Sequence, residues 1–195
     1  MKEKLKIMIA EDEAIILLNL RMILESHGYE VVAEAMNGEE ACQKAITLKP
    51  DLLLIDINLP KMNGLDVIGY INQKVRIPSI IITGYRDEEF VERASKMGVY
   101  AYLHKPVTQE ELLAAIQISV NRFREYQASV RTEIEAIRKL EDRKIVEKAK
   151  GILMDQLGLK EADAMKALQK RSKESNKKLV VVAQEIIHKM RILNE

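Results

Sequence analysis

The first 120 residues alternate between two hydrophobic patterns. Short runs rich in β-branched residues predict strands, and segments with apolar residues three or four positions apart predict helices. The expected strands are residues 5–10, 31–35, 52–57, 80–83 and 100–103, and the expected helices are residues 14–26, 39–48, 65–73 and 88–96. This order predicts an α/β domain with a five-stranded, parallel, doubly wound sheet, whose binding crevice lies beyond the carboxyl ends of the strands.

A different pattern begins after Pro106, where 44 residues contain neither glycine nor proline. Thr108 followed by Glu111 predicts a helix N-cap. From residue 116 a heptad seam with six apolar members and one glutamine favours a dimeric coiled coil, and a stripe packed inside one chain is the alternative. The seam consists of Ile116, Val120, Phe123, Gln127, Val130, Ile134 and Ile137.

The last 50 residues predict a small all-α unit. Three helical segments, 145–157, 161–173 and 179–193, each carry one apolar stripe, and Gly158 and Ser175–Asn176 separate them. We therefore expect three parts in the chain: a first domain at 1–121, a coiled-coil helix at 122–143 and a three-helix domain at 144–195.

Composition excludes several classes of protein. Cys42 is the single cysteine, so a disulfide framework and a Cys₄ zinc site are excluded. The longest apolar runs fall far short of the roughly 20 residues that span a bilayer. The N-terminal segment turns acidic before a signal-peptide stretch develops. We expect a cytoplasmic protein that does not interact with membranes.

Charge divides the chain in two. Residues 1–120 carry 13 basic and 18 acidic side chains, net −5, and residues 121–195 carry 18 and 12, net +6. A basic C-terminal part suggests that nucleic acid or another acidic partner binds there. A solvated basic helix face without a partner is the alternative.

Charged and hydroxyl side chains follow four of the five expected strands. These residues are Glu11, Asp12, Asp56, Thr83 and Lys105. Three carboxylates that meet at one sheet edge repel one another unless a cation lies between them. Mg²⁺ prefers such oxygen ligands, and a carboxylate, a lysine and a hydroxyl around it form a phosphoryl-transfer site.

These motifs identify a resemblance that covers residues 1 to about 120. IAEDE, DINLPKMNG, IITGY and AYLHKP, in this order, resemble the receiver domain of two-component response regulators, which has a flavodoxin-like fold. The resemblance implies that Asp56 accepts a phosphoryl group from a sensor histidine kinase, with Lys105 pairing with the phosphoryl oxygens. It also implies a cis peptide bond before Pro106.

The resemblance further implies the metal ligands and a switch. Asp12 would bind Mg²⁺ directly, Glu11 through water, and Asn58 through its backbone carbonyl, and Asp56 would belong to the same metal site. Glu11 stands where many receivers have aspartate, which bears on the affinity for Mg²⁺. Phosphorylation would draw the Thr83 hydroxyl toward the phosphoryl group and let Tyr102 rotate.

An enzyme of the haloacid-dehalogenase type is the alternative for the first domain. Those phosphatases carry Asp-x-Asp on the first strand, whereas this chain has Asp56-Ile-Asn58 on the third. We therefore expect a regulator that accepts a phosphoryl group and loses it by autodephosphorylation, and not an enzyme.

The C-terminal unit resembles the ANTAR domain, an RNA-binding antiterminator module. AKGILM at 149–154, NKKL at 176–179 and the Val182–Ala183 pair carry the resemblance. It implies a dimer that binds paired hairpins in nascent mRNA leaders. The candidate RNA contacts are Lys148, Lys150, Lys170, Arg171, Lys173, Asn176, Lys177 and Lys178.

The C-terminal unit lacks the aromatic side chains that often stack on RNA bases. No Phe, Trp or Tyr follows Tyr126, so an unstacked base has no such ring on which to lie. A DNA-binding output and a protein-binding adaptor are the rival functions. A mostly apolar last helix disfavours a DNA-recognition helix, and the basic charge disfavours an adaptor.

Overall fold

The computed structural model describes residues 4–84 and 97–193. The chain divides into two compact units, Met1–Gln127 and Ala128–Glu195. The expected helix at 88–96 lies outside the described residues. The division into three parts at 121 and 143 is not tested by these two units and stays a prediction.

The first unit is built on a parallel sheet with the strand order β2-β1-β3-β4-β5. All four strand pairs are parallel, as the alternating pattern predicted. Each strand agrees with its expected range to within one residue at either end. The strands are β1 (Lys6–Ala10), β2 (Glu30–Ala35), β3 (Leu52–Asp56), β4 (Ser79–Thr83) and β5 (Val99–His104).

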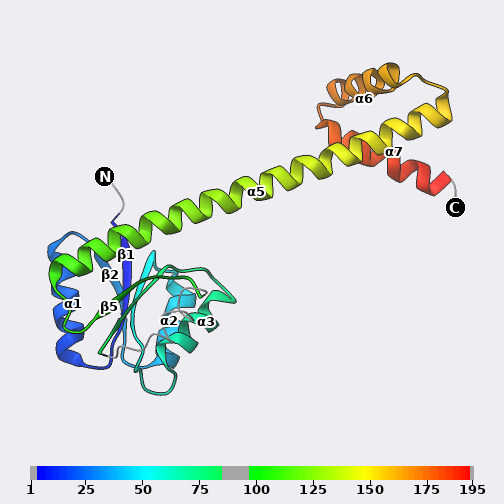
Figure 1. The fold of residues 1–195 in the computed structure, drawn as a ribbon. Helices are drawn as coiled ribbons and strands as arrows, with labels where there is room; N and C mark the ends of the chain where they lie inside the picture. The colour runs from blue at the N-terminus through cyan, green and yellow to red at the C-terminus, as the bar shows by residue number, and fades with distance from the viewer. Residues whose placement is uncertain (1–3, 85–96, 194–195) are drawn as a thin grey trace. The chain divides into compact units, whose positions relative to one another are not determined.

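Helices cover both faces of this sheet (Figure 1). The helices α2 (Gly38–Leu48) and α3 (Gly64–Asn72) pack on one face, against Met8, Ile55 and Ile81. On the other face, α1 (Ala14–Ser26) and the first turns of α5 (Gln109–Leu157) pack against the alternate residues of the same strands. β3 is buried at all five positions, because it lies between two strands and under helices on both sides.

The N-terminus of α5 carries the predicted cap. The Glu111 backbone N–H donates to the Thr108 hydroxyl at 3.3 Å, and the Glu111 carboxylate accepts from the Thr108 N–H at 3.0 Å. This reciprocal pair satisfies two of the amide donors that a helix N-terminus leaves open. The helix therefore begins where the sequence predicted.

The start of the predicted heptad seam belongs to the core of the first unit. Ile116 is 1% exposed, so it is not available to a second chain, and Val120 is half-buried against the same cluster. The Phe123 ring meets the Tyr100 ring edge to face at 5.9 Å. The prediction of a dimer seam is therefore wrong at Ile116, because the core of the first unit covers this residue. For the later members it stays a prediction.

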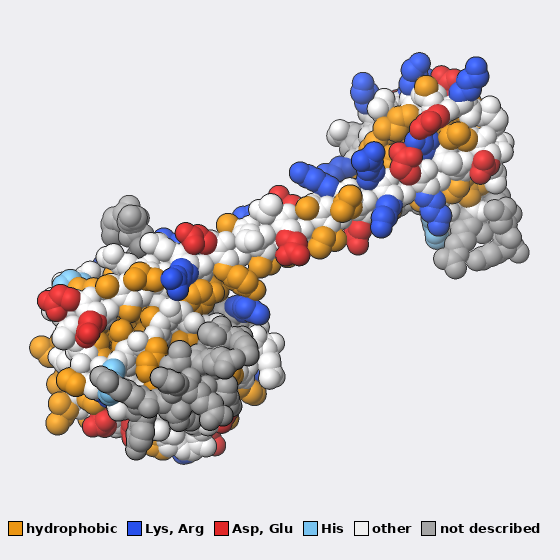
Figure 2. Space-filling view, viewed as in Figure 1, with side chains coloured by type: hydrophobic (Ala, Val, Ile, Leu, Met, Phe, Trp, Pro, Cys, Tyr) orange, Lys and Arg blue, Asp and Glu red, His pale blue; other side chains and the backbone are white. Residues whose placement is uncertain are grey.

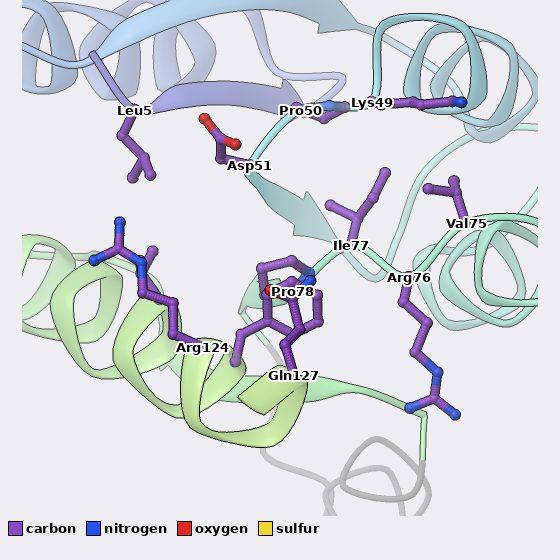
Figure 3. Close-up of a pocket in the computed structure, with 12 residues that line it drawn as sticks. Leu5, Lys49, Pro50, Asp51, Val75, Arg76, Ile77, Pro78, Arg124 and Gln127 are labelled. Carbon is purple, nitrogen blue, oxygen red and sulfur yellow. The ribbon is translucent and has the colours of Figure 1, made fainter. Parts of the chain in front are cut away.

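A cavity of about 240 Å³ lies at the amino ends of the strands, the edge opposite the expected crevice. In Figure 3, Arg124 and Gln127 of α5 lie on one side of it, and Pro50, Asp51 and Ile77 lie on the other. Arg76, which also lines the cavity, lies over the Tyr126 ring at 5.3 Å. Aromatic and cation–π contacts thus attach α5 to this edge.

The second unit packs the end of α5 with α6 (Glu161–Ser175) and α7 (Leu179–Leu193). Ala149, Leu168, Val182 and Ala183 are fully buried in its core. The sequence predicted a separate helix at 145–157, but this segment is the continuation of α5. The helix continues because residues 107–150 contain neither glycine nor proline. Among the described residues, no helix is long and apolar enough to cross a membrane.

Candidate functional site

Four charged side chains meet at the carboxyl ends of β1, β3 and β5. The Lys105 ammonium lies 2.7 Å from Asp56 Oδ2 and 2.9 Å from Glu11 Oε1. A third carboxylate, that of Glu13, lies 3.5 Å from the same nitrogen. The Lys105–Pro106 peptide bond is cis, as the resemblance implied. The parallel topology brings these residues together from positions up to 94 apart in the sequence.

This cluster is shielded from solvent. The side chains of Glu11, Asp56 and Lys105 are 1%, 6% and 15% exposed. Burial raises the pKa of Glu11, although Lys105 opposes this shift. Burial lowers the pKa of Lys105, but hydrogen bonds to Asp56 and Glu11 outweigh it and raise that pKa overall. Lys105 is therefore held as a cation within reach of the Asp56 carboxylate.

The acidic residues fit a divalent cation. Glu11, Asp12 and Asp56 each offer a carboxylate oxygen, and these oxygens all lie within 4.8 Å of one another. The Oε2 atom of Glu11 is buried and has no hydrogen-bond partner within residues 4–84 and 97–193. An unsatisfied buried carboxylate oxygen beside two further acids suits a hard cation such as Mg²⁺.

The loop after β3 holds Asp56 in position. The backbone N–H of Asn58 donates to Asp56 Oδ1 at 3.2 Å. A Cβ atom at Gly64 would collide with the carbonyl oxygen of Asp56, so this close approach requires glycine. The Asn63 side chain caps α3 by accepting the Asp66 N–H at 3.0 Å. Hydrogen bonds thus hold the loop at both of its ends.

Thr83 and Tyr102 lie on the same face of the sheet. Thr83 is fully buried at the end of β4, and the Lys105 backbone N–H donates to its carbonyl at 2.9 Å. Tyr102 pairs with Ile81 in the register of β4 and β5, and it packs on the cluster that contains Ile81. Because Thr83 follows Ile81 by two residues, it faces the side on which Tyr102 lies.

In the second unit, three of the candidate RNA contacts have internal roles. The side chain of Lys150 is 12% exposed and lies 2.5 Å from Glu147 and 2.7 Å from Glu161, so it joins α5 to α6. Lys177 pairs with Glu185 at 2.5 Å. Asn176 ends α6 in the left-handed conformation, with φ of 51°. This backbone conformation accounts for the presence of asparagine at position 176 without an RNA contact.

The remaining candidates stand on the surface. Figure 2 shows Lys and Arg side chains gathered over the second unit, with apolar side chains between them. These exposed candidates are Lys148, Lys170, Arg171, Lys173 and Lys178. Two charged residues outside the predicted set also have notable positions: Glu13 lies beside Lys105, and Arg143 lies in a groove with Lys178. The acidic run of IAEDE could have indicated Glu13, whereas nothing in the sequence singles out Arg143.

Comparison with known proteins agrees with both resemblances. Residues 7–117 match the response regulator receiver domain, and residues 135–187 match the ANTAR domain. The chain is 37% identical to the transcriptional regulatory protein PdtaR of Mycobacterium tuberculosis (strain ATCC 25618 / H37Rv) over 182 residues, 93% of this chain and 89% of PdtaR. It is 30% identical to the transcriptional regulatory protein YdfI of Bacillus subtilis (strain 168), over 59% of this chain and 54% of YdfI.

Solved receiver structures share the fold of the first unit. A CheY-like receiver domain protein from Methanospirillum hungatei JF-1 matches with a TM-score of 0.59 and 30% identity, over 64% of this chain and 99% of that one. The response regulator domain of Thermotoga maritima CheB matches with a TM-score of 0.58 and 27% identity, over 61% and 98%. The chain therefore belongs to the response regulators that join a receiver domain to an RNA-binding ANTAR domain, a family that acts in transcription antitermination.

Proposed function

We propose that a sensor histidine kinase phosphorylates this regulator on Asp56, and that the phosphorylated chain dimerises and binds hairpins in nascent mRNA leaders. The observation that carries the first step is the buried contact of 2.7 Å between Lys105 and Asp56, beside the acidic cluster. Glu11, Asp12, Asp56 and the carbonyl of Asn58 would hold Mg²⁺. When bound, this ion would neutralise charge on the transferring phosphoryl group.

Asp56 and Lys105 divide the chemistry between them. A carboxylate oxygen of Asp56 attacks phosphorus, a new P–O bond forms, and the P–N bond to the kinase histidine breaks. The imidazole leaves with the electron pair of that bond. Lys105 binds the phosphoryl oxygens, and its contacts with Asp56 and Glu11 place it for this role. Loss of the group by autodephosphorylation would reset the regulator.

The switch would operate through the shared face of β4 and β5. The phosphoryl oxygens would attract the Thr83 hydroxyl, and Tyr102 would rotate into the space that it leaves. Tyr102 is half-buried against the sheet, so a rotation would change the surface of the receiver. This change would favour the dimer.

The dimer would use the later part of the seam. Ile134 is 60% exposed, Ile137 is 50% exposed, and Val130 is half-buried. An apolar stripe on a helix is covered in a parallel coiled coil by the same stripe of a second copy. Gln127, exposed at one seam position, weakens the pairing and leaves room for a switch of a few kcal/mol.

A phosphodonor experiment tests the first step. Acetyl phosphate in Mg²⁺ should label the chain, and Asp56→Asn should abolish the labelling because the nucleophile is gone. Asp155→Asn, which changes an exposed carboxylate of α5 in the second unit, should be labelled like the wild type. Labelling of Asp56→Asn at another residue would contradict the assignment.

Crosslinking in cells tests the output. The nucleic acid attached to the protein is sequenced, and we expect fragments of mRNA leaders. Recovery of promoter DNA would contradict the proposed target.

A further inference from the structure

A groove opens on the second unit where α5, α6 and α7 meet. Its volume is about 430 Å³, and it lies wholly within this unit. The groove forms because the N-terminus of α7 packs beside α5 and α6 and leaves a space between their side chains. The lining residues are Asp142, Arg143, Val146, Glu147, Met165, Lys178, Leu179 and Val180.

The floor of this groove is apolar and rests on the core. Val146 and Leu179 are half-buried and pack against the buried cluster of the unit. Met165 adds a polarisable thioether, which makes favourable contacts with flat π-systems. A nucleobase has two such flat faces, so this floor can receive a base without an aromatic side chain.

Two of the cations that line the groove have no carboxylate partner among the described residues. Glu147 is already paired with Lys150 at 2.5 Å. Arg143 and Lys178 are exposed and form no ion pair within residues 4–84 and 97–193, whereas Lys177 is neutralised by Glu185. Arg143 and Lys178 are therefore available to pair with the phosphates of a nucleic acid.

The geometry points to one occupant. We infer that the groove receives a single unstacked base of an RNA hairpin loop, with Arg143 and Lys178 on the flanking phosphates. Asp142 accepts a hydrogen bond from an N–H group on the edge of that base. This inference rests on the proposed RNA-binding function and names the part of the domain that would read the loop.

The two kinds of groove residue would act differently. Arg143 and Lys178 contribute attraction that does not depend on sequence, and the Arg143 guanidinium can also lie flat on the exposed face of a base. Asp142 can only accept hydrogen bonds when ionised, so it favours a base with a donor at the contacted edge. The groove would thus supply affinity through its rim and selectivity through one carboxylate.

Binding by the full-length chain tests the rim. The probes are a synthetic hairpin with a randomised loop and a blunt RNA duplex with the same stem. Arg143→Ala and Lys178→Ala should each weaken hairpin binding about tenfold, the loss expected for one stacked base or phosphate contact. Each should also reduce the log–log salt slope by about 0.7. Binding of the duplex should change much less.

Lys166→Ala is the matched control, because it removes the same charge from an exposed position of α6 outside the groove. An equal loss of hairpin affinity in Lys166→Ala and the groove variants would contradict base binding in the groove. It would not contradict the proposed RNA-binding function. A wild-type preference for duplex DNA over both RNA probes would overturn the function and the groove together. Thermal melting should show that all three variants fold, since the altered side chains are exposed.

Asp142→Asn tests the proposed hydrogen bond between the Asp142 carboxylate and the edge of the base. The variant keeps the shape of the side chain and adds an amide donor, so it should select different loop sequences from the randomised pool than the wild type does. Selection of the same loops by both proteins would show that Asp142 does not contact a base, and would overturn this part of the inference.

Discussion

At the scale of single residues, Lys105 is the cation on which the receiver site depends. It lies between the carboxylates of Asp56 and Glu11, and it is 15% exposed. Removing it would leave two buried carboxylates that repel each other. The same side chain would bind the phosphoryl oxygens. Its loss should therefore leave phosphorylation intact and weaken the dimerisation that phosphorylation would cause.

We expect Lys105→Ala to accept label from acetyl phosphate in Mg²⁺ and yet to dimerise poorly, because the nucleophile remains while the cation that binds the phosphoryl oxygens is gone. Labelling and analytical ultracentrifugation on the same samples measure both effects. Lys61→Ala is the control, because it removes an exposed lysine of the loop after β3 that is paired with Glu39 of α2. Activation of Lys105→Ala equal to wild type would reduce Lys105 to a structural role.

Asn176 is a second residue whose role can be decided by substitution. Its φ of 51° is strained for any side chain except glycine, and asparagine tolerates it better than most. Asn176→Gly should keep both stability and RNA affinity, and Asn176→Ala should lose roughly 1 kcal/mol of unfolding free energy. Thermal melting and hairpin binding test this. A loss of hairpin affinity in a fully stable Asn176→Gly would show that the side chain contacts RNA.

At the scale of elements, α5 carries two different apolar surfaces along one helix. Its first turns are part of the receiver core, where Leu112 and Ile116 are buried. Further along, Ile134 and Ile137 stand at least half exposed. One heptad pattern therefore serves an intramolecular core first and, in the proposed dimer, an interface between chains later.

Two isoleucine substitutions should separate these surfaces. Ile116→Ala should destabilise the receiver by about 2–5 kcal/mol, because it leaves a cavity in a packed core. Ile134→Ala should change the stability of the monomer by less than about 0.5 kcal/mol and should weaken the phosphorylated dimer. Denaturant unfolding and ultracentrifugation measure the two quantities. If Ile134→Ala dimerised like wild type, the seam beyond residue 130 would not be the interface.

At the scale of the whole molecule, an acidic receiver is joined to a basic output. The net charges of −5 and +6 on residues 1–120 and 121–195 belong to the receiver domain and to the part that contains the RNA-binding ANTAR domain. Dimerisation would place two RNA-binding units on one particle. Two linked hairpins would then bind through effective concentration.

Phosphorylation should tighten binding to an RNA with two linked hairpins by roughly 100-fold or more, and should change the affinity for either hairpin alone much less. Titrations of the three RNAs with protein treated or not treated with phosphodonor measure this difference. The same tightening on single and paired hairpins would indicate that phosphorylation uncovers the RNA surface in each chain and does not act by pairing two chains.

The local features of this protein could be predicted from sequence. Hydrophobic period and turn residues predicted the order of the strands and helices and most of their bounds, because strands and helices impose different spacings. The Thr108–Glu111 cap depends on residues three apart and was predicted for that reason. The site at the strand ends followed from parallel topology, which puts Asp56 and Lys105 at one edge.

Tertiary packing decided what local patterns left open. The seam looked uniform in sequence, and only the sheet beneath it showed that Ile116 is buried while Ile134 is exposed. Lys150 and Lys178 look alike in a basic segment, yet Lys150 is neutralised by Glu161, 11 positions away, and Lys178 lines a groove. The order of the amino acids specifies which side chains are charged or apolar. Which of them stay unpaired and exposed depends on the fold, because ion pairs and burial involve neighbours distant in the chain.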